Sequence, residues 1–201
     1  MPNEIQLRQT LARPYLPATQ TPQVAYVLIE IIPTAVTANV QMPINVAFVL
    51  DRSGSMRGNK LRAMQQAVGL ALDKLSDSDT VSITVFNHET AVVVPTTTAS
   101  DRGQIKRLIN GIRDEGGTKI SRAMFAGLTE LASAPGGRLS RLVLLTDGET
   151  DRDENECLDL ADQAGSNGVA ITALGVGNEW NDKLLTGIAQ RSNGEVEHLR
   201  P

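Results

Sequence analysis

Apolar stretches of two kinds alternate along most of the chain. Short apolar runs typical of strands cover 24–32, which is rich in β-branched residues, and 44–50, 81–86, 91–94, 142–145 and 169–174. Stretches in which apolar residues recur every three or four positions, typical of helices, are centred on 59–75, 105–112, 120–131, Cys157 and 184–188. This alternation predicts an α/β fold of three layers: a doubly wound, mainly parallel central sheet with helices on both faces.

Two links depart from the parallel order. The three residues Asn87-His88-Glu89 are too few for a parallel crossover, so the runs 81–86 and 91–94 are predicted to form a hairpin. That hairpin would give the sheet one antiparallel edge strand. The runs 24–32 and 44–50 follow each other closely, which predicts an antiparallel pair and hence an extra N-terminal strand.

The same pattern divides the chain into three parts. Residues 1–23 are rich in Pro, Gln and Thr and have neither a helical nor a strand period, so they are predicted to be an N-terminal tail or strap. Residues 24–42 would be the additional strand with its connection. Residues 43–201 would form one α/β domain.

Composition and charge exclude several classes of protein. The net charge of -4 argues against sequence-independent phosphate binding, and 3% aromatic residues are too few for a nucleic-acid stacking platform, so no nucleic-acid partner is expected. No apolar stretch reaches the ~20 residues of a membrane span, and the N-terminus lacks the pattern of a signal peptide. The single Cys157 excludes an internal disulfide and is predicted to be buried on an apolar helix face. We therefore expect a cytoplasmic protein, or a piece of a larger protein, with no membrane partner.

Polar residues follow two of the predicted strands. Asp51 comes directly after the run 44–50, and Asp147 follows the run 142–145. The carboxyl ends of parallel strands meet at one edge of the sheet, where ligands of open α/β folds bind. The hairpin reverses the chain and the next helix returns it, so Thr118 is predicted to arrive at the same edge.

The spacing Asp51-x-Ser53-x-Ser55 can turn a carboxylate and two hydroxyl groups toward one point. Carboxylates, hydroxyls and water are hard oxygen ligands, and the pattern offers neither a thiolate nor an imidazole. Such donors suit Mg²⁺ or Mn²⁺. The sequence therefore predicts a divalent-cation site at this edge.

Residues 44–56, the Gly-Gly-Thr at 116–118 and the Leu-Leu-Thr-Asp-Gly at 144–148 together resemble the metal-ion-dependent adhesion site (MIDAS) of von Willebrand factor type A (VWA) domains. The resemblance covers about residues 24–198, and the phrase Val-Leu-Asp-Arg-Ser-Gly-Ser-Met is more similar to the bacterial branch of the family than to integrin domains. It implies an adhesion or scaffold module that binds Mg²⁺, or Mn²⁺, with Ca²⁺ as an alternative.

The resemblance also implies a role for each matching residue. Ser53, Ser55 and Thr118 would supply oxygens to the metal, and Asp51 and Asp147 would act directly or through water. The remaining metal position would take a Glu or Asp side chain of a partner protein.

Two other functions remain open. One is an Mg²⁺-dependent hydrolase or phosphatase with Asp51 as nucleophile, although a haloacid dehalogenase type of phosphatase would be expected to carry a second Asp where this chain has Ser53. The other is a scaffold domain of a larger assembly with a purely structural metal. Because neither His88 nor His198 has a partner that would orient it, no catalytic residue is assigned.

Three further features have alternative explanations. Gly175-Val176-Gly177 is similar to part of a nucleotide-binding loop but lacks the third glycine. The acidic residues between Glu149 and Glu156 either select a cation or a basic partner, or cap the following helix. Trp180 either flanks the metal site as a partner contact or packs against its own loop.

Overall fold

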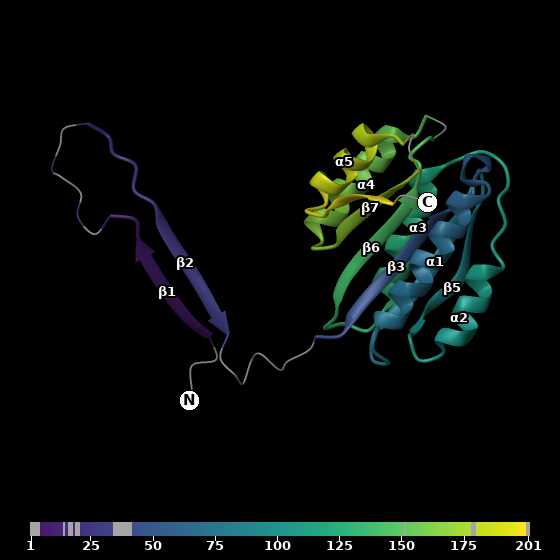
Figure 1. Cartoon of the computed structure of the whole chain (residues 1–201), viewed down its shortest axis with the longest axis horizontal. Coiled ribbons are helices and arrows are strands. Elements are labelled where there is room, and N and C mark those ends of the chain that lie inside the picture. Colours follow the sequence, from purple (N-terminus) through teal and green to yellow (C-terminus); the bar gives the residue numbers. More distant parts are fainter. Residues whose placement is uncertain are drawn as a thin grey trace. The chain divides into compact units, whose positions relative to one another are not determined.

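The computed structural model of the chain describes residues 5–13, 15, 18, 21–33, 42–150, 152–177 and 180–199. The chain divides into two compact units, Met1–Gln41 and Met42–Pro201, each with its own sheet (Figure 1). Within the described ranges, no helix combines the length and apolar character that crossing a bilayer requires.

The larger unit contains a six-stranded sheet with the order β5-β4-β3-β6-β7-β8. β4 and β6 flank β3 in parallel, β7 and β8 continue the sheet in parallel, and β5 pairs with β4 antiparallel. The predicted mainly parallel sheet with one antiparallel edge strand is therefore confirmed. The strands are β3 (Ile44–Asp51), β4 (Thr80–Phe86), β5 (Thr90–Thr98), β6 (Leu139–Thr146), β7 (Ala170–Val176) and β8 (Val196–Leu199).

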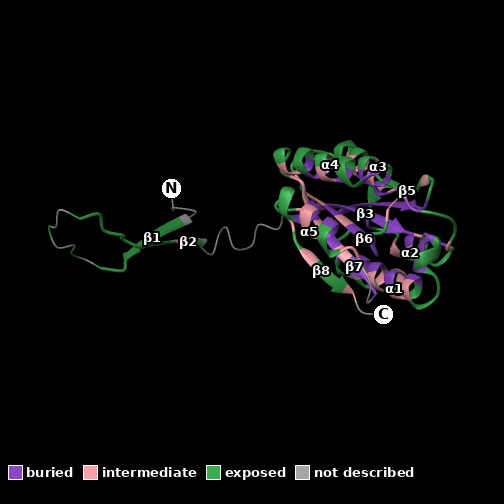
Figure 2. Cartoon of the chain, turned by 90° about the horizontal axis from the view of Figure 1, so that it is seen from above, coloured by how far each residue is buried: buried purple, intermediate pink, exposed green. Residues whose placement is uncertain are grey.

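Helices cover both faces of this sheet, as predicted, and two hydrophobic clusters lie between the layers (Figure 2). The central strand β3 contributes to both: Phe48 and Leu50 belong to the cluster with α1 and α2, and Ala47 and Val49 to the cluster with α3, α4 and α5. This alternation is the period of a strand buried on both faces. The helices are η1 (Gly54–Met56, 3-10), α1 (Asn59–Lys74), α2 (Arg102–Asn110), α3 (Ile120–Ser133), α4 (Glu154–Ser166) and α5 (Asp182–Arg191).

Cys157 is buried on the inner face of α4, as the apolar spacing predicts. Burial raises the pKa of its thiol, and the nearby Asp153, Glu156 and Glu154 add to this shift. The thiol therefore stays protonated near neutral pH, which makes it a packing residue rather than a nucleophile.

The smaller unit corrects two predictions. Residues 5–11, predicted to be part of an irregular tail, form strand β1 (Ile5–Leu11), which pairs antiparallel with β2 (Val27–Pro33). The pair predicted between 24–32 and 44–50 is wrong, because parallel neighbours occupy both edges of β3. Leu7 and Leu11 of β1 lie on the same side of the strand. Because Gln and Thr residues stand between them, the sequence does not show the regular alternation of apolar and polar residues that is typical of a strand.

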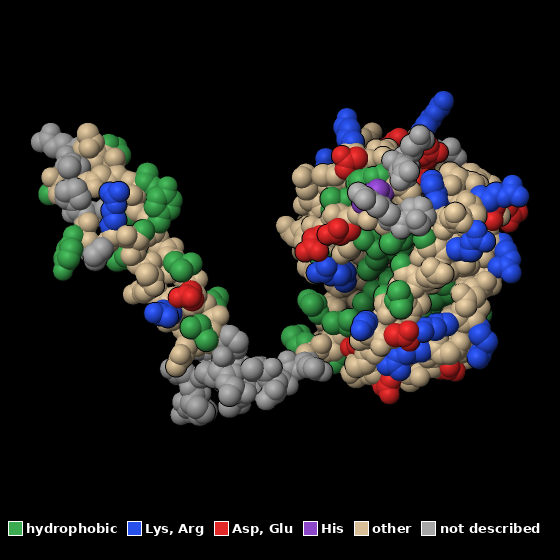
Figure 3. Space-filling model, viewed as in Figure 1, with side chains coloured by type: hydrophobic (Ala, Val, Ile, Leu, Met, Phe, Trp, Pro, Cys, Tyr) green, Lys and Arg blue, Asp and Glu red, His purple; other side chains and the backbone are tan. Residues whose placement is uncertain are grey.

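Apolar side chains are exposed along this hairpin (Figure 3). Leu7 is 73% exposed, Ile29 65% and Ile31 67% within the described structure. A two-stranded hairpin is at best marginally stable by itself in water. The N-terminal unit thus presents more apolar surface than its own two strands can bury.

The carboxylate of Asp79 holds the start of β3 in place. It is buried in the turn before β4 and accepts hydrogen bonds from the backbone N–H of Ile44 at 2.9 Å and of Ser76 at 2.6 Å. Burial by itself would raise the pKa of Asp79, but these hydrogen bonds outweigh it and lower the pKa. Since the folded pKa lies below the unfolded value, this stabilisation is present above about pH 4 and is lost as the pH falls through the folded pKa.

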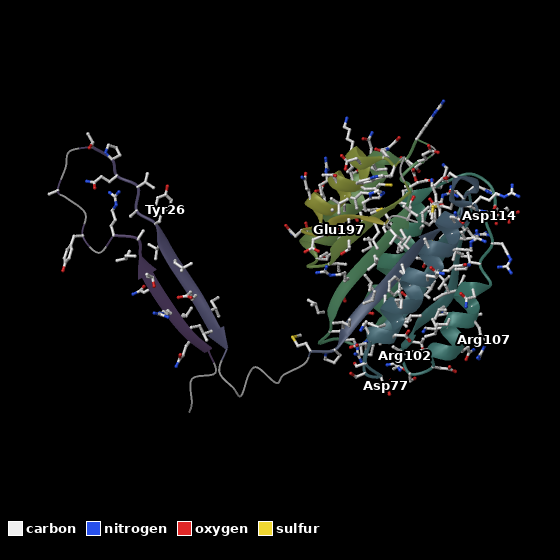
Figure 4. The ribbon with its side chains drawn as sticks, viewed as in Figure 1. Tyr26, Asp77, Arg102, Arg107, Asp114 and Glu197 are labelled. Atoms are coloured by element: carbon white, nitrogen blue, oxygen red, sulfur yellow. The ribbon has the colours of Figure 1, made fainter. Side chains whose placement is uncertain are left out.

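We expect Asp79→Ala to lower the free energy of unfolding by about 2 to 4 kcal/mol, because it leaves two backbone N–H groups without their charged acceptor. Asp77→Ala is the matched control: Asp77 lies in the same turn, is 76% exposed, and forms an ion pair with Arg102 at 2.8 Å (Figure 4). An exposed pair of this kind contributes at most about 1 kcal/mol. Urea denaturation at neutral pH compares the two variants, and equal losses would contradict this role of Asp79.

Candidate metal centre

The predicted site residues come from three loops at the carboxyl edge of the sheet. Asp51 ends β3 and Asp147 follows β6, and these strands are parallel neighbours with Leu50 opposite Leu145. The third loop, which joins α2 to α3, carries Thr118. Asp114 lies in this loop (Figure 4). It forms an ion pair with Arg57, the residue that follows η1, with 3.8 Å between Oδ2 of Asp114 and Nε of Arg57.

Backbone hydrogen bonds tie the Thr118 loop to its neighbours. The N–H of Gly54 donates to the carbonyl of Gly116 at 2.9 Å, and the N–H of Glu115 donates to the carbonyl of Arg52 at 2.8 Å. On the other side, Lys119 donates to the carbonyl of Asn87 at 2.8 Å. The loop is therefore attached both to the residues that follow β3 and to those that follow β4, where the predicted chain path places it.

Asp51 is fully buried at the centre of this edge. Its Oδ1 accepts a hydrogen bond from the N–H of Ser53 at 2.7 Å, and its Oδ2 accepts one from the hydroxyl of Thr146 at 2.6 Å. Burial raises the pKa of Asp51 to about 6, although these hydrogen bonds oppose the shift. Thr146, which the sequence analysis did not assign to the site, orients the carboxylate.

The hydroxyl groups of Ser53 and Ser55 lie 3.0 Å apart, on the turn that begins η1. Ser53 is buried, and Met56, also buried, fixes the end of the turn in the core. Thr118 is buried as well, at 8% exposure. Three hydroxyl-bearing side chains therefore belong to the loops that surround Asp51.

Asp147 is 1% exposed, and its two carboxylate oxygens differ. Oδ2 accepts a hydrogen bond from the ammonium group of Lys60 at 3.0 Å. Oδ1 is buried and has no hydrogen-bond partner among the described residues. An unpaired buried carboxylate oxygen is costly, which makes this atom a candidate ligand for a group that the protein itself does not provide.

These donors fit a hard divalent cation. They are two carboxylates and three hydroxyls, a set typical of Mg²⁺ or Mn²⁺, and one carboxylate oxygen is unpaired. Within the described ranges there is no group of three or more His, Cys, Asp or Glu side chains that could hold a metal ion.

A family model for the von Willebrand factor type A domain matches residues 45–199. The chain belongs to this family. VWA domains generally mediate protein–protein interactions, commonly bind a divalent metal at a MIDAS, and are usually not catalytic.

In sequence, the chain is similar to an uncharacterised protein, sll0103, of Synechocystis, with 32% identity over 160 residues. It is also similar to human inter-alpha-trypsin inhibitor heavy chain H4, with 31% identity over 170 residues. Each match covers 79% of this chain but only 38% of the Synechocystis protein and 18% of the human protein. The VWA domain thus corresponds to a minor part of these longer relatives.

Solved structures share the fold at lower identity. A VWA protein from Catenulispora acidiphila is 20% identical, with a TM-score of 0.72 over 98% of this chain and 45% of that protein. Proximal thread matrix protein 1 of the mussel byssus, in a structure with a zinc-occupied MIDAS motif, is 20% identical, with a TM-score of 0.68 over 79% of this chain and 42% of that protein.

The glycines of Gly175-Val176-Gly177 serve packing in this VWA domain. A Cβ on Gly175 would come within 2.5 Å of the Trp180 ring, and one on Gly177 within 2.5 Å of Cε of Lys60. Trp180 is half-buried against the core and stacks on the ring of His198, with 5.9 Å between ring centroids. These contacts support a packing role for both glycines and for Trp180.

The acidic residues after Asp147 also have structural roles. The buried Asp153 accepts a hydrogen bond from the N–H of Ser121 in the first turn of α3, at 2.8 Å. Glu154 and Glu156 lie in the first turn of α4, where negative charge is favourable. Asp153 is the N-cap residue of α4, but its side chain makes no capping hydrogen bond to that helix, so of the capping explanation only the favourable helix-dipole interaction of Glu154 and Glu156 is supported; Asp151 lies outside the described residues.

The geometry disfavours the hydrolase alternative. Both oxygens of Asp51 accept hydrogen bonds and its side chain is fully buried, which is a poor arrangement for nucleophilic attack. His88 is exposed and lies against Gly116, and Nε2 of His198 is hydrogen-bonded to the carbonyl of Gly177. Neither imidazole contacts Asp51, so neither is positioned to act with it as a general base.

Proposed function

We propose that this VWA domain binds partner proteins through a divalent cation that takes an acidic side chain of the partner. Ser53, Ser55 and Thr118 would hold the cation by their hydroxyls, and Asp51 and Asp147 would hold it directly or through water. The observation that carries the proposal is the buried, unpaired Oδ1 of Asp147 at the edge where these hydroxyls gather.

The charges of these donors favour an anionic ligand. Hydroxyl groups are neutral, so only two of the five proposed ligands carry negative charge. When bound, the cation would offer an electrophilic position for a carboxylate. At ~4 Å and an effective dielectric of ~20, a carboxylate gains about 4 kcal/mol per unit of positive charge before desolvation is subtracted. About 1.4 kcal/mol of this energy is enough to change the affinity for the partner tenfold.

The choice of metal follows from the same donor set. The mussel protein of the same fold carries zinc at its MIDAS motif, which supports metal binding at this edge of a VWA fold. The donors of the present chain include no thiolate or imidazole, which zinc usually prefers. We therefore propose Mg²⁺ or Mn²⁺ as the cation here.

A selection experiment tests the proposed function without a known partner. Random peptides displayed on phage are selected on the immobilised protein in Mg²⁺ and eluted with EDTA. We expect the enriched peptides to share a Glu or Asp whose change to Gln or Asn abolishes binding. Enriched peptides that lack an acidic residue, or that stay bound in EDTA, would contradict the proposal. Loss of the circular dichroism spectrum in EDTA would instead favour a structural metal.

Thr118→Ala is expected to weaken Mg²⁺ binding about tenfold, because it removes one neutral ligand, while thermal unfolding stays nearly unchanged. Thr129→Ala is the matched control, since Thr129 is exposed in α3 and its hydroxyl bonds only the carbonyl of Phe125. Isothermal titration calorimetry measures both affinities. The same affinity in the two variants would remove Thr118 from the proposed ligand set.

A further inference from the structure

Lys60 contacts the candidate metal centre, although neither the sequence motif nor the family assigns it a role there. It lies in the first turn of α1, and its ammonium nitrogen is 3.0 Å from Oδ2 of Asp147. The side chain of Lys60 is 25% exposed and that of Asp147 is 1% exposed. The pair therefore lies largely inside the protein.

This ion pair differs from the others in the described part of the chain. The carboxylates of those pairs are 30% to 76% exposed, so water solvates them whether or not the cation is present. Asp147 has almost no such access. Removing the partner of a buried charge is strongly destabilising, so Lys60 is the group that makes an ionised Asp147 tolerable.

The backbone leaves room for the lysine at this position. Gly177 follows β7 with a φ of +94°, and a Cβ there would come within 2.5 Å of Cε of Lys60. Any other residue at 177 would push the lysine stem away from Asp147 or strain the turn. The glycine at the end of β7 therefore leaves the lysine side chain the space it needs to reach the carboxylate.

We propose that Lys60 is a built-in counter-cation of the metal centre, an inference that rests on the proposed function. In the metal-free protein it neutralises Asp147, and it lowers the affinity for a divalent cation by repulsion and by competition for the same carboxylate. In the loaded protein, two carboxylates, one ammonium group and a dication leave a net positive charge. Lys60 thus makes the loaded centre depend on an acidic ligand.

Calorimetric titration with Mg²⁺ alone tests this role in the full chain. Lys60→Met keeps the length and apolar stem of the side chain but removes its charge, and we expect it to bind Mg²⁺ about tenfold more tightly than the wild type. Lys74→Met is the matched control: Lys74 is exposed in the last turn of the same helix, about 21 Å away along its axis. We expect its affinity to stay within about twofold of the wild type. Lys60→Arg, which keeps the charge, should also keep the wild-type affinity.

Whether Mg²⁺ affinity rises or falls in Lys60→Met separates the counter-cation role of Lys60 from a purely structural role. Lys60→Met should also melt at a lower temperature than the wild type without metal, and Mg²⁺ should recover the difference. A lysine needed only for packing would, when replaced, leave Mg²⁺ affinity unchanged or reduce it, and either result would overturn the inference. Lys60→Gln repeats the test if Lys60→Met does not fold. Failure of the wild type itself to bind Mg²⁺ would instead overturn the proposed function, and this inference with it.

Discussion

Asp51→Asn is expected to reduce the affinity for Mg²⁺ about 100-fold or more at about pH 7.5. The substitution keeps the shape of the side chain but removes a negative charge at the centre of the site. The attraction between a carboxylate and a dication at ~4 Å is about 8 kcal/mol at an effective dielectric of ~20, before desolvation. A third of that energy corresponds to about a 100-fold change in affinity.

The pKa of Asp51 sets the pH dependence of the same measurement. Burial raises the pKa to about 6 from an ordinary value of 3.8, so the folded, metal-free protein holds this proton more tightly than the unfolded chain. The ionised group therefore costs stability above about pH 6, by roughly 2 to 3 kcal/mol, and this cost disappears below about pH 4. Mg²⁺ binding by the wild type should accordingly weaken as the pH falls below 6, by up to about tenfold per pH unit.

Calorimetric measurement of Mg²⁺ affinity near pH 7.5 and pH 5 checks both expectations. Asp159→Asn, a change at an exposed residue of α4, is the control. Thermal unfolding in EDTA adds an independent measurement, because the neutral Asn side chain should make the metal-free protein at least as stable as the wild type at pH 7.5. Wild-type Mg²⁺ affinity in Asp51→Asn would show that this carboxylate is not part of a metal site.

Gly194→Ala is expected to lower the free energy of unfolding by about 3 kcal/mol or more. A Cβ on Gly194 would lie 2.0 Å from the carbonyl oxygen of Ile171 in β7, and a backbone atom cannot rotate away as a side chain can. The turn after α5 would have to move and would disturb the pairing of β8 with β7.

Gly136→Ala is the matched control for this prediction. Gly136 lies in the turn before β6, and a Cβ there would meet nothing within 4 Å. Urea denaturation should leave this variant within about 0.5 kcal/mol of the wild type. Similar losses in both variants would mean that the close approach of Gly194 to β7 does not govern stability.

The elements of the larger unit could be predicted because each carries its own periodicity. Strand β3 is buried on both faces and has a continuous apolar run, and the helices show apolar positions every three or four residues. Strand β8 has only four residues, Val196 to Leu199, two of them charged or titratable, so it gives no comparable signal. Short edge strands take their conformation from the neighbouring strand rather than from their own sequence.

The N-terminal hairpin of β1 and β2 was harder to predict, because a strand can pair only with another strand that has a free edge. The run 24–32 indicates a strand but does not identify its partner, and the nearest candidate, β3, is paired with β4 on one edge and with β6 on the other. β1 supplies the partner instead, with Leu7 opposite Ile31.

The candidate site likewise contains some residues that could be placed from the sequence and others that could not. Asp51 and Asp147 could be placed together because parallel strands end at a common edge. The contacts of Lys60 and Thr146 could not, because they depend on which side chain reaches each carboxylate oxygen and not only on where the strands end. A lysine in the first turn of an amphipathic helix has the same local pattern as any exposed lysine, and only the folded chain brings it to a buried carboxylate.

We propose that five residues hold one divalent cation: Asp51, Ser53, Ser55, Thr118 and Asp147. A crystal structure grown with Mn²⁺ tests it most directly, because anomalous scattering identifies manganese independently of the protein density. We expect one anomalous peak at this edge, about 2.1 to 2.2 Å from the hydroxyl oxygens and octahedrally coordinated by oxygen. A structure from Mn²⁺-saturated crystals with no peak there, or with its peak at other residues, would contradict it.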